Sequence, residues 1–350
     1  MTLDKMLALT SATGKLGSAV ISAILENKLI DPKHLVICVR SLLPYLSPNS
    51  ILTLNPQKKP PPSAQLTLHQ QTSSSPTSPR LSHLQNQSLT IRHADFTLPF
   101  SLTAAYTGCT CLFLVSTPAI HLDYSNAPPG SGREAHHRAA IDAALSVGVK
   151  HIYYTSLAFA NPSKAGVMRA HMRTEAYLRA LEQQGKCKVT ILREGLYNES
   201  WPLYFGYYYG LKDEARKEVV VAGEGKVCWT AIADMAYATA RILAEGGEVW
   251  AGKTVYLAQK RGVSLGEIAQ IVSRVKGEEV RLKVVGRKEY EDYYVNERGL
   301  ESPAVEWWSS TYEALADGEC EIDDSTLEDM LKEVGRKPKA IEATIEEMMG

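Results

Sequence analysis

The sequence predicts an α/β protein with a doubly wound, mainly parallel sheet, and three observations support this fold class. Short apolar runs alternate with helical segments through the first half of the 350 residues. The connections between most of them are a few residues long, as in βαβ units. The first strand passes through a glycine-containing turn directly into a helix, which is the arrangement of a Rossmann-type fold.

The individual elements follow from the lengths and patterns of these segments. Strands are short runs bounded by turn residues, and we expect them at residues 5–10, 34–40, 88–93, 111–116, 151–156 and 188–193. Helices are expected at residues 16–26, 98–106, 133–147 and 168–184. Together these elements predict a dinucleotide-binding Rossmann core over residues 1–193.

Residues 42–87 differ from the rest of this half in composition. They are rich in Pro, Ser, Thr and Gln and include three consecutive prolines at 60–62. Such a segment buries too little apolar surface to offset the entropy of ordering it, so we expect a disordered surface insertion. A partner-binding role for its prolines stays open, although an inert insertion is favoured.

The chain changes character after residue 193. Tyr and Trp concentrate at 197–209 and again at 290–308, whereas a helix at 231–245 and a strand at 254–257 return to the α/β pattern. A helix at 264–275 and a strand near 280–285 follow, with two late helical stretches. We expect residues 194–350 to form a smaller α/β substrate-covering lobe that partly completes the core around 229–258.

Composition and charge exclude several classes of function. The formal net charge is -1, without the basic face that nucleic-acid binding requires. No apolar stretch is long enough to cross a bilayer, and no leader is recognisable, so we expect a cytoplasmic protein, monomeric or homodimeric. The six cysteines fit no common zinc spacing and are interpreted as core thiols. His136 and His137 are interpreted as solvated or helix-capping residues, and no metal site is expected.

The turn at residues 10–17 is the first candidate binding site. A strand that enters a helix through such a turn directs unpaired N–H groups and the positive end of the helix dipole at one point, which suits a phosphate. Gly14 is expected to let the backbone turn sharply, and Gly17 to let the helix pack closely on the strand. Ser11 stands where the first glycine of the three-glycine fingerprint would be.

Arg40 is the second candidate, because it ends the second strand. In a doubly wound fold this position faces the adenosine ribose, where an acidic residue selects NADH and an arginine accepts the 2′-phosphate of NADPH. No Asp or Glu occurs between His34 and Ser41. The expected cofactor is therefore NADPH, and the alternative is a solvated arginine at a strand end.

Several further motifs occur in the same order as in one known family. The sequence resembles the NmrA-like family of atypical short-chain dehydrogenases, and especially its NADPH:quinone oxidoreductases and fungal members from aromatic polyketide pathways. The motifs that carry this resemblance are Thr10 to Gly17, Arg40, Ala94-Asp95-Phe96, Leu114 to Thr117, His151 to Leu157, His171-x-x-x-Glu175 and Leu192 to Glu199.

The resemblance implies a role for each matching residue. It places at the cofactor Thr10, Ala12, Thr13, Gly14, Lys15, Leu16, Gly17, Arg40, Ser116, Thr117, Thr155 and Ser156. It also implies that Tyr197 and Asn198 form the floor of a substrate cleft. The aromatic run that includes Trp201 and Tyr204 could form a wall for a polycyclic or quinoid ring, although an ordinary aromatic core would have the same composition.

The chain departs from most short-chain dehydrogenases at the proton donor. No Tyr-x-x-x-Lys pair lies at the usual distance after Ser156, where His171 and Glu175 share a helix face instead. His171 is a candidate proton donor, with Glu175 holding its tautomer or raising its pKa, and Ser156 is the third candidate catalytic residue. The alternative is that this pair only braces the cofactor or the helix.

Two functions follow from these observations. The first is an NADPH-dependent oxidoreductase that transfers hydride to a quinone or aromatic polyketide-type substrate, in fungal secondary metabolism. The second is a non-catalytic NADP(H)-sensing regulator that binds a transcription factor. His171, Glu175 and the aromatic residues favour the enzyme.

Overall fold

The structure is a computed structural model that describes residues 6–40, 66–67, 89–210 and 215–350. The predicted insertion at 42–87 lies outside the described residues except for 66–67, which form a short strand. Among the described residues, no helix combines the length and the apolar character needed to cross a membrane.

The described chain contains one large sheet in the order β10-β7-β6-β5-β1-β2-β4-β3. All neighbours pair in parallel except β3 with β4, which confirms the predicted α/β, mainly parallel fold class. Pairing starts at β1 and proceeds outward in both directions, so the sheet is doubly wound. Its strands are β1 (Leu7–Leu9), β2 (Leu35–Val39), β3 (Leu66–Thr67), β4 (Thr90–His93), β5 (Cys111–Leu114), β6 (His151–Leu157), β7 (Lys188–Glu194) and β10 (Thr254–Leu257).

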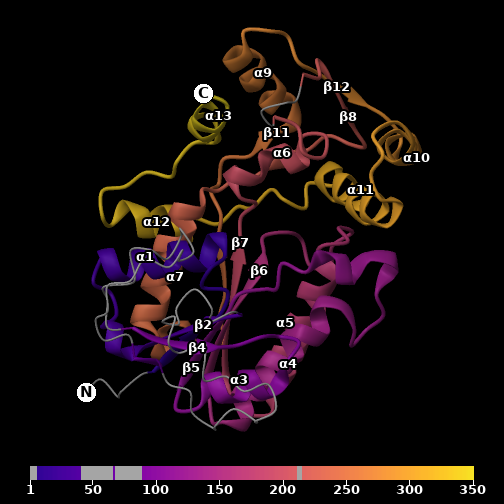
Figure 1. Ribbon diagram of the computed structural model, residues 1–350. Coiled ribbons are helices and arrows are strands. Elements are labelled where there is room, and N and C mark those ends of the chain that lie inside the picture. The colour runs from indigo at the N-terminus through magenta and orange to yellow at the C-terminus, as the bar shows by residue number, and fades with distance from the viewer. Residues whose placement is uncertain (1–5, 41–65, 68–88, 211–214) are drawn as a thin grey trace, which may run out of the picture.

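Helices cover both faces of the sheet, as Figure 1 shows. One face packs against α1 (Lys15–Glu26), α7 (Ile232–Glu245) and α12 (Thr326–Lys332). The other packs against α3 (Pro99–Tyr106), α4 (Gly132–Ser146) and α5 (Met168–Gln183). Side chains alternate between these two apolar layers along each strand, as in a sheet covered on both sides.

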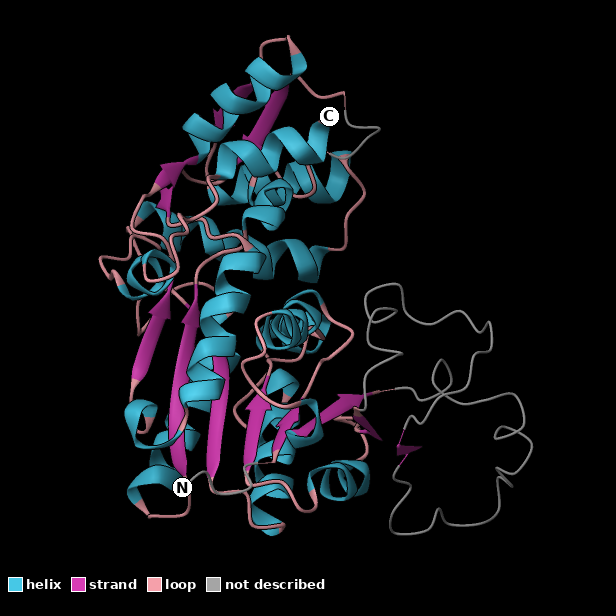
Figure 2. Cartoon of the chain, turned by 90° about the vertical axis from the view of Figure 1, so that its left-hand side faces the viewer, coloured by secondary structure: helices cyan, strands magenta, loops and turns pink. Residues whose placement is uncertain are grey.

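The remaining elements gather beyond the carboxyl ends of the strands, to which the arrowheads point in Figure 2. A separate apolar and aromatic cluster holds them together. They include two strand pairs, β8 with β12 and β9 with β11. The elements are α6 (Trp201–Tyr204), β8 (Glu218–Val221), β9 (Lys226–Val227), β11 (Val263–Ser264), α9 (Leu265–Lys276), β12 (Arg281–Val284), α10 (Arg287–Asp292), α11 (Ser302–Ala316) and α13 (Ile341–Met349).

The sequence-based expectations for the core differ from the structure mainly at element ends. The strand at 254–257 has the expected bounds, whereas β1 is shorter than the expected 5–10. The strand expected at 111–116 ends at Leu114, so Ser116 lies in the loop that follows β5. That loop is where the polar contacts of the candidate site begin.

Candidate functional site

The turn between β1 and α1 forms a close approach of helix and strand. Ser11 adopts the left-handed conformation, with φ of 54°, and Gly14 donates its N–H to the Ser11 carbonyl at 2.8 Å. Gly14 itself has φ of -74°, and a Cβ at this position would lie 3.1 Å from the Ser11 carbonyl oxygen, so Gly14 closes the turn without a positive φ. The strained residue is Ser11, at the position of the missing glycine.

Gly17 has the role expected from the sequence. A Cβ at this position would overlap the Ser11 carbonyl oxygen, so only glycine lets α1 begin this close to the turn. No side chain caps the N-terminus of α1, whose first N–H groups are oriented towards this turn. The turn therefore fits a pyrophosphate by its backbone geometry and its helix dipole.

Two threonines join the carboxyl ends of the central strands. Thr10 Oγ1 donates to the Phe113 carbonyl at 3.2 Å and accepts from the Val115 N–H at 2.9 Å. Thr155 Oγ1 accepts from the Ser116 N–H at 2.9 Å. These side chains hold β1, β5 and β6 together at the edge of the turn, so their hydroxyl groups are already engaged within the protein.

Arg40 is exposed directly after β2. Burial acts to raise the pKa of Asp95. Hydrogen bonds from Thr97 and the charges of His93 and Arg40 outweigh this effect and lower the pKa. The Arg40 guanidinium is thus close enough to the end of β4 to act on a carboxylate there. Its exposure leaves it accessible to a ligand at the same edge of the sheet.

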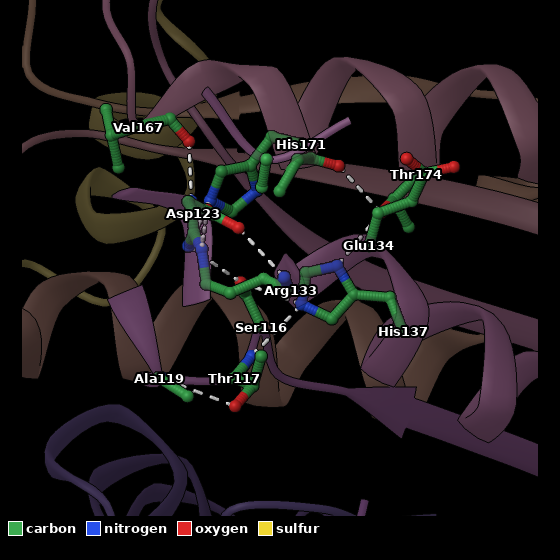
Figure 3. A network of polar contacts seen from close by, with 12 residues as sticks. Ser116, Thr117, Ala119, Asp123, Arg133, Glu134, His137, Val167, His171 and Thr174 are labelled. Carbon is green, nitrogen blue, oxygen red and sulfur yellow. Dashed lines mark hydrogen bonds and ion pairs between the residues drawn. The ribbon is translucent and has the colours of Figure 1, made fainter. Parts of the chain in front are cut away.

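His137 lies at the centre of the buried polar network shown in Figure 3. Its Nε2 accepts from the Thr117 N–H at 3.1 Å and lies 3.1 Å from Ser116 Oγ. Because a backbone N–H can only donate, the ring proton is on Nδ1, 2.9 Å from Thr174 Oγ1. Burial and the charge of Arg133 lower the pKa of His137 well below its ordinary value. The interpretation of His137 as solvated or capping is wrong, since its exposed fraction is 0%.

Arg133 joins this network to the neighbouring loops. Its Nε donates to Asp123 Oδ2 at 2.5 Å, and its backbone N–H donates to Asp123 Oδ1 at 2.8 Å. Its Nη2 donates to the Val167 carbonyl at 2.6 Å. Both charged side chains are buried, so this ion pair fixes the start of α4 against the segment Ile120–Asn126, and the hydrogen bond to Val167 connects it to the start of α5 (Figure 3).

His171 belongs to the same network. Arg133 Nη1 lies 3.5 Å from Nε2, and since a guanidinium only donates, the imidazole proton is on Nδ1. That proton faces the Tyr154 hydroxyl at 3.0 Å. Burial and the charge of Arg133 lower the pKa of His171 well below its ordinary value, so the ring is neutral at neutral pH.

Glu175 does not support His171 as the sequence suggested. Its carboxylate accepts from Arg193 Nη2 at 2.7 Å and from Nε at 3.2 Å, in a buried bidentate pair. Asn161 Nδ2 donates a third hydrogen bond to this carboxylate. The expectation that Glu175 orients His171 or raises its pKa is therefore wrong, because Arg193 occupies Glu175 and Arg133 faces His171.

Three buried polar atoms near the ends of β6 and β7 have no hydrogen-bond partner. They are Ser156 Oγ, Glu194 Oε1 and Asn198 Oδ1, in side chains that are at most 2% exposed. Buried polar groups are rarely left unpaired in folded proteins, so such atoms indicate a place for a ligand or water. Ser156 and Asn198 were expected at the cofactor and in the substrate cleft, whereas Glu194 was not singled out.

The predicted substrate residues have different environments. The hydroxyl of half-buried Tyr197 donates to Glu194 Oε2 at 2.9 Å. Asn198 Nδ2 donates to the Lys339 carbonyl at 3.0 Å and lies 3.1 Å from Thr344 Oγ1, which ties it to the C-terminal segment. Trp201 and Tyr204 are buried in the aromatic core, as the alternative of an ordinary core expects.

Sequence reasoning missed several members of the network. Asp123, Arg133 and Tyr154 are far apart in the sequence and meet only where β5, β6, α4 and α5 converge, so spacing gave no signal. Glu194 could have been found as a carboxylate that ends an apolar strand. Among the described residues, no group of three or more His, Cys, Asp or Glu side chains is placed to hold a metal ion.

Comparison with known proteins supports the resemblance seen in the sequence. The profile of the NmrA-like family matches residues 3–342. The NmrA-like family domain-containing oxidoreductase flvB of Aspergillus flavus is 29% identical over 262 residues, which cover 73% of this chain and 79% of that protein. Quinone oxidoreductase 2 of Escherichia coli is 29% identical over 281 residues, covering 79% and 76%.

A solved structure is also similar to this chain over nearly its whole length. The triphenylmethane reductase of Citrobacter sp., solved in complex with NADP(H), superposes with a TM-score of 0.71 and 25% identity, over 98% of this chain and 99% of that one. The match of the family profile covers nearly all of the sequence, including the β1–α1 turn and the histidine network. This chain belongs to the NmrA-like family.

Proposed function

We propose that this protein is an NADPH-dependent oxidoreductase that reduces a quinone or an aromatic polyketide-type carbonyl compound. The relatives named above are oxidoreductases, one of them a quinone reductase, and one neighbouring structure contains NADP(H). A place in fungal secondary metabolism, which the sequence resemblance implies, is part of this proposal. When bound, NADPH supplies a hydride to the acceptor.

The observation that carries this proposal is the turn at Ser11 to Gly17. It combines the uncapped N-terminus of α1, whose first N–H groups suit a phosphate, with a glycine that lets this helix begin close against the turn. The groups proposed to line the cofactor are the backbone of residues 12–17, Arg40 at the 2′-phosphate, and the loop Ser116–Thr117. Thr155 and Ser156 would lie near the nicotinamide.

The preference for NADPH rests on Arg40. A charge-assisted contact between Arg and phosphate contributes roughly 1.5–3 kcal/mol, which is more than tenfold in affinity. Arg40→Ala should therefore weaken NADPH binding more than tenfold and leave NADH binding almost unchanged. Lys33→Ala is the matched control, because it removes one positive charge at the other end of β2. Equal losses for both dinucleotides in Arg40→Ala would contradict this role.

We also propose that residues 194–350 act as the substrate-binding lobe, with Tyr197 and Asn198 at its floor. Support comes from their position directly after β7 and from the unpaired Asn198 Oδ1. The lobe would close over the carboxyl edge of the sheet, where ligands bind in doubly wound folds.

Turnover is the direct test of this function. Purified protein is mixed with NADPH and a panel of quinones, anthraquinones and triphenylmethane dyes, and the absorbance of the reduced cofactor is followed. The proposal expects oxidation of NADPH that depends on at least one acceptor. Tight NADPH binding without turnover on any acceptor would overturn it and favour the regulatory alternative.

A further inference from the structure

Glu194 is the last residue of β7 and is 2% exposed. It pairs in register with Leu157 of β6 and Leu257 of β10, so its neighbours in the sheet are apolar. Alternation along β7 places it on the face of Leu192, which belongs to the α1 and α7 layer. Thr155 of β6 lies two residues before Leu157 on this same face.

One oxygen of this carboxyl group is occupied and the other is not. Tyr197 donates to Oε2 at 2.9 Å, whereas Oε1 has no partner and is buried. Burial raises the pKa of Glu194 to about 8, against the smaller lowering effect of the Tyr197 hydrogen bond. Because Tyr197 uses Oε2 as an acceptor, the proton of the neutral acid is on Oε1, where it faces no acceptor of the protein.

The charged groups around Glu194 are engaged elsewhere. Arg193 lies on the opposite face of β7 and pairs with Glu175. On α7, Asp234 accepts from Arg336 and from the Lys339 N–H. Glu199 accepts from the Ile232 N–H at the start of α7. Its charge raises the pKa of Tyr197 and does not contribute to the pKa of Glu194. Within the described residues, no cation therefore neutralises Glu194.

We infer that Glu194 is the proton donor of the reaction, with Oε1–H directed at the carbonyl oxygen of the bound acceptor. This inference rests on the proposed function. It is supported by the position of Glu194 at the carboxyl edge, beside the strand that carries Thr155 and Ser156, and by its unpaired oxygen. His171 is then a positioning residue, since both of its ring nitrogens face protein groups.

The proposed step is balanced in atoms and electrons. The acceptor gains two electrons and one hydrogen nucleus as hydride from the reduced dinucleotide, and one proton from Glu194 Oε1 at its carbonyl oxygen. The O–H bond of Glu194 breaks and the O–H bond of the reduced product forms. The Glu194 carboxylate then regains a proton from water, so the cycle consumes one NADPH and one proton per acceptor.

The first test is the pH dependence of turnover. The wild-type protein should lose kcat above about pH 8, as Glu194 ionises. Glu194→Gln keeps the size of the side chain and a hydrogen-bond donor but carries no transferable proton. Its kcat should therefore fall about 100-fold or more, and the alkaline limb of the profile, which is the loss of kcat above about pH 8, should disappear. Glu245→Gln, at the far end of α7, is the matched control and should keep the wild-type profile.

A second variant distinguishes a proton donor from a residue that only supports the fold. Tyr197→Phe removes the hydrogen bond that lowers the pKa of Glu194, so the alkaline limb should move to higher pH. The readout independent of activity is a ¹³C NMR titration of labelled glutamate in the protein without ligands. It should show one carboxyl group that titrates near pH 8 and is absent in Glu194→Gln.

The outcomes separate this inference from the proposed function. If the wild-type protein reduces an acceptor while Glu194→Gln keeps its kcat and its alkaline limb, the inference fails and the function stands. A Glu194 carboxyl resonance that titrates near the ordinary value of about 4.5 would also overturn the inference. If no acceptor is reduced by the wild-type protein, the proposed function itself fails.

Discussion

Two polar regions at the carboxyl edge of the sheet differ in how completely their groups are paired. Around His137, the ion pair Arg133–Asp123 and both histidines have partners on every side. At the end of β7 and directly after it, the side chains of Glu194 and Asn198 each leave a buried atom without a partner. The first region is fully paired, whereas the second has hydrogen-bonding atoms that no protein group uses.

The comparison shows why buried polar residues should not be equated with catalytic ones. A fully paired network fixes loops and resists change, because each group loses hydrogen bonds if it moves. An unpaired buried group carries a desolvation cost of about 1–3 kcal/mol that folding does not recover. A ligand that supplies the missing partner recovers it, which is the expected property of a binding site.

The largest expected effect comes from breaking the ion pair of the paired region. Arg133→Ala leaves the Asp123 carboxylate buried without its cation, so the free energy of unfolding should fall by about 3–5 kcal/mol. Arg138→Ala on the same helix removes a half-exposed arginine from the buried Glu134, which keeps the Gly130 N–H and Arg173 as partners, so the loss should be clearly smaller. Denaturant unfolding of both variants measures the difference, and equal losses would contradict the importance of the buried pair.

The contributions of the two regions to stability should also change with pH in opposite directions. His137 and His171 have lowered pKa values, so the unfolded chain binds more protons below about pH 6.5 and stability falls as the solution becomes more acidic. Glu194 has a raised pKa, so the folded chain holds its proton between about pH 4.5 and 8, and stability falls as pH rises through this window. Each of these titrating groups changes the free energy of unfolding by at most about 1.4 kcal/mol per pH unit.

Glu194→Gln should remove the alkaline part of this profile and keep the acid part. Thermal unfolding of the wild type and this variant between pH 4.5 and 9 is the measurement. A variant that loses stability with rising pH as steeply as the wild type would show that Glu194 is ionised in the folded state.

A smaller effect is expected at His171. His171→Ala removes one of the two histidine partners of the Tyr154 hydroxyl and should lower the free energy of unfolding by about 1–3 kcal/mol. Because the ring is neutral and held by protein groups, kcat should change less than tenfold in protein that stays folded. A fall in kcat of about 100-fold or more is expected when a general acid is lost. Such a fall in His171→Ala would show that His171 is the proton donor.

The smallest effect concerns the turn between β1 and α1, which is the proposed pyrophosphate site. Ser11→Gly relieves a left-handed residue with φ of 54°, so stability should rise, by no more than about 1 kcal/mol. Ser11→Ala is the control, because it removes the hydroxyl and keeps the Cβ. A gain in Ser11→Ala that equals that of Ser11→Gly would show that the hydroxyl, and not the backbone, is responsible.

The sequence predicted most of the fold because its signals are local. The turn at Gly14 and Gly17, the apolar runs and the order of the motifs lie within short windows, where periodicity and glycine spacing are informative. The roles of Glu175 and His137 could not be predicted in this way. Each depends on which distant side chain reaches it, and Arg193 and Thr117 are set against them only by the packing of α4 and α5.

By itself, the sequence determined the doubly wound sheet, the glycine-containing turn between β1 and α1 and the membership in the NmrA-like family. Tertiary structure alone decided which polar residues are satisfied. Hydrogen bonding and burial depend on atoms that converge from several strands and helices, so His171 became part of a closed network while Glu194 kept a free oxygen. Desolvation then set the pKa values in opposite directions, because burial disfavours the charged form of both a histidine and a carboxylate.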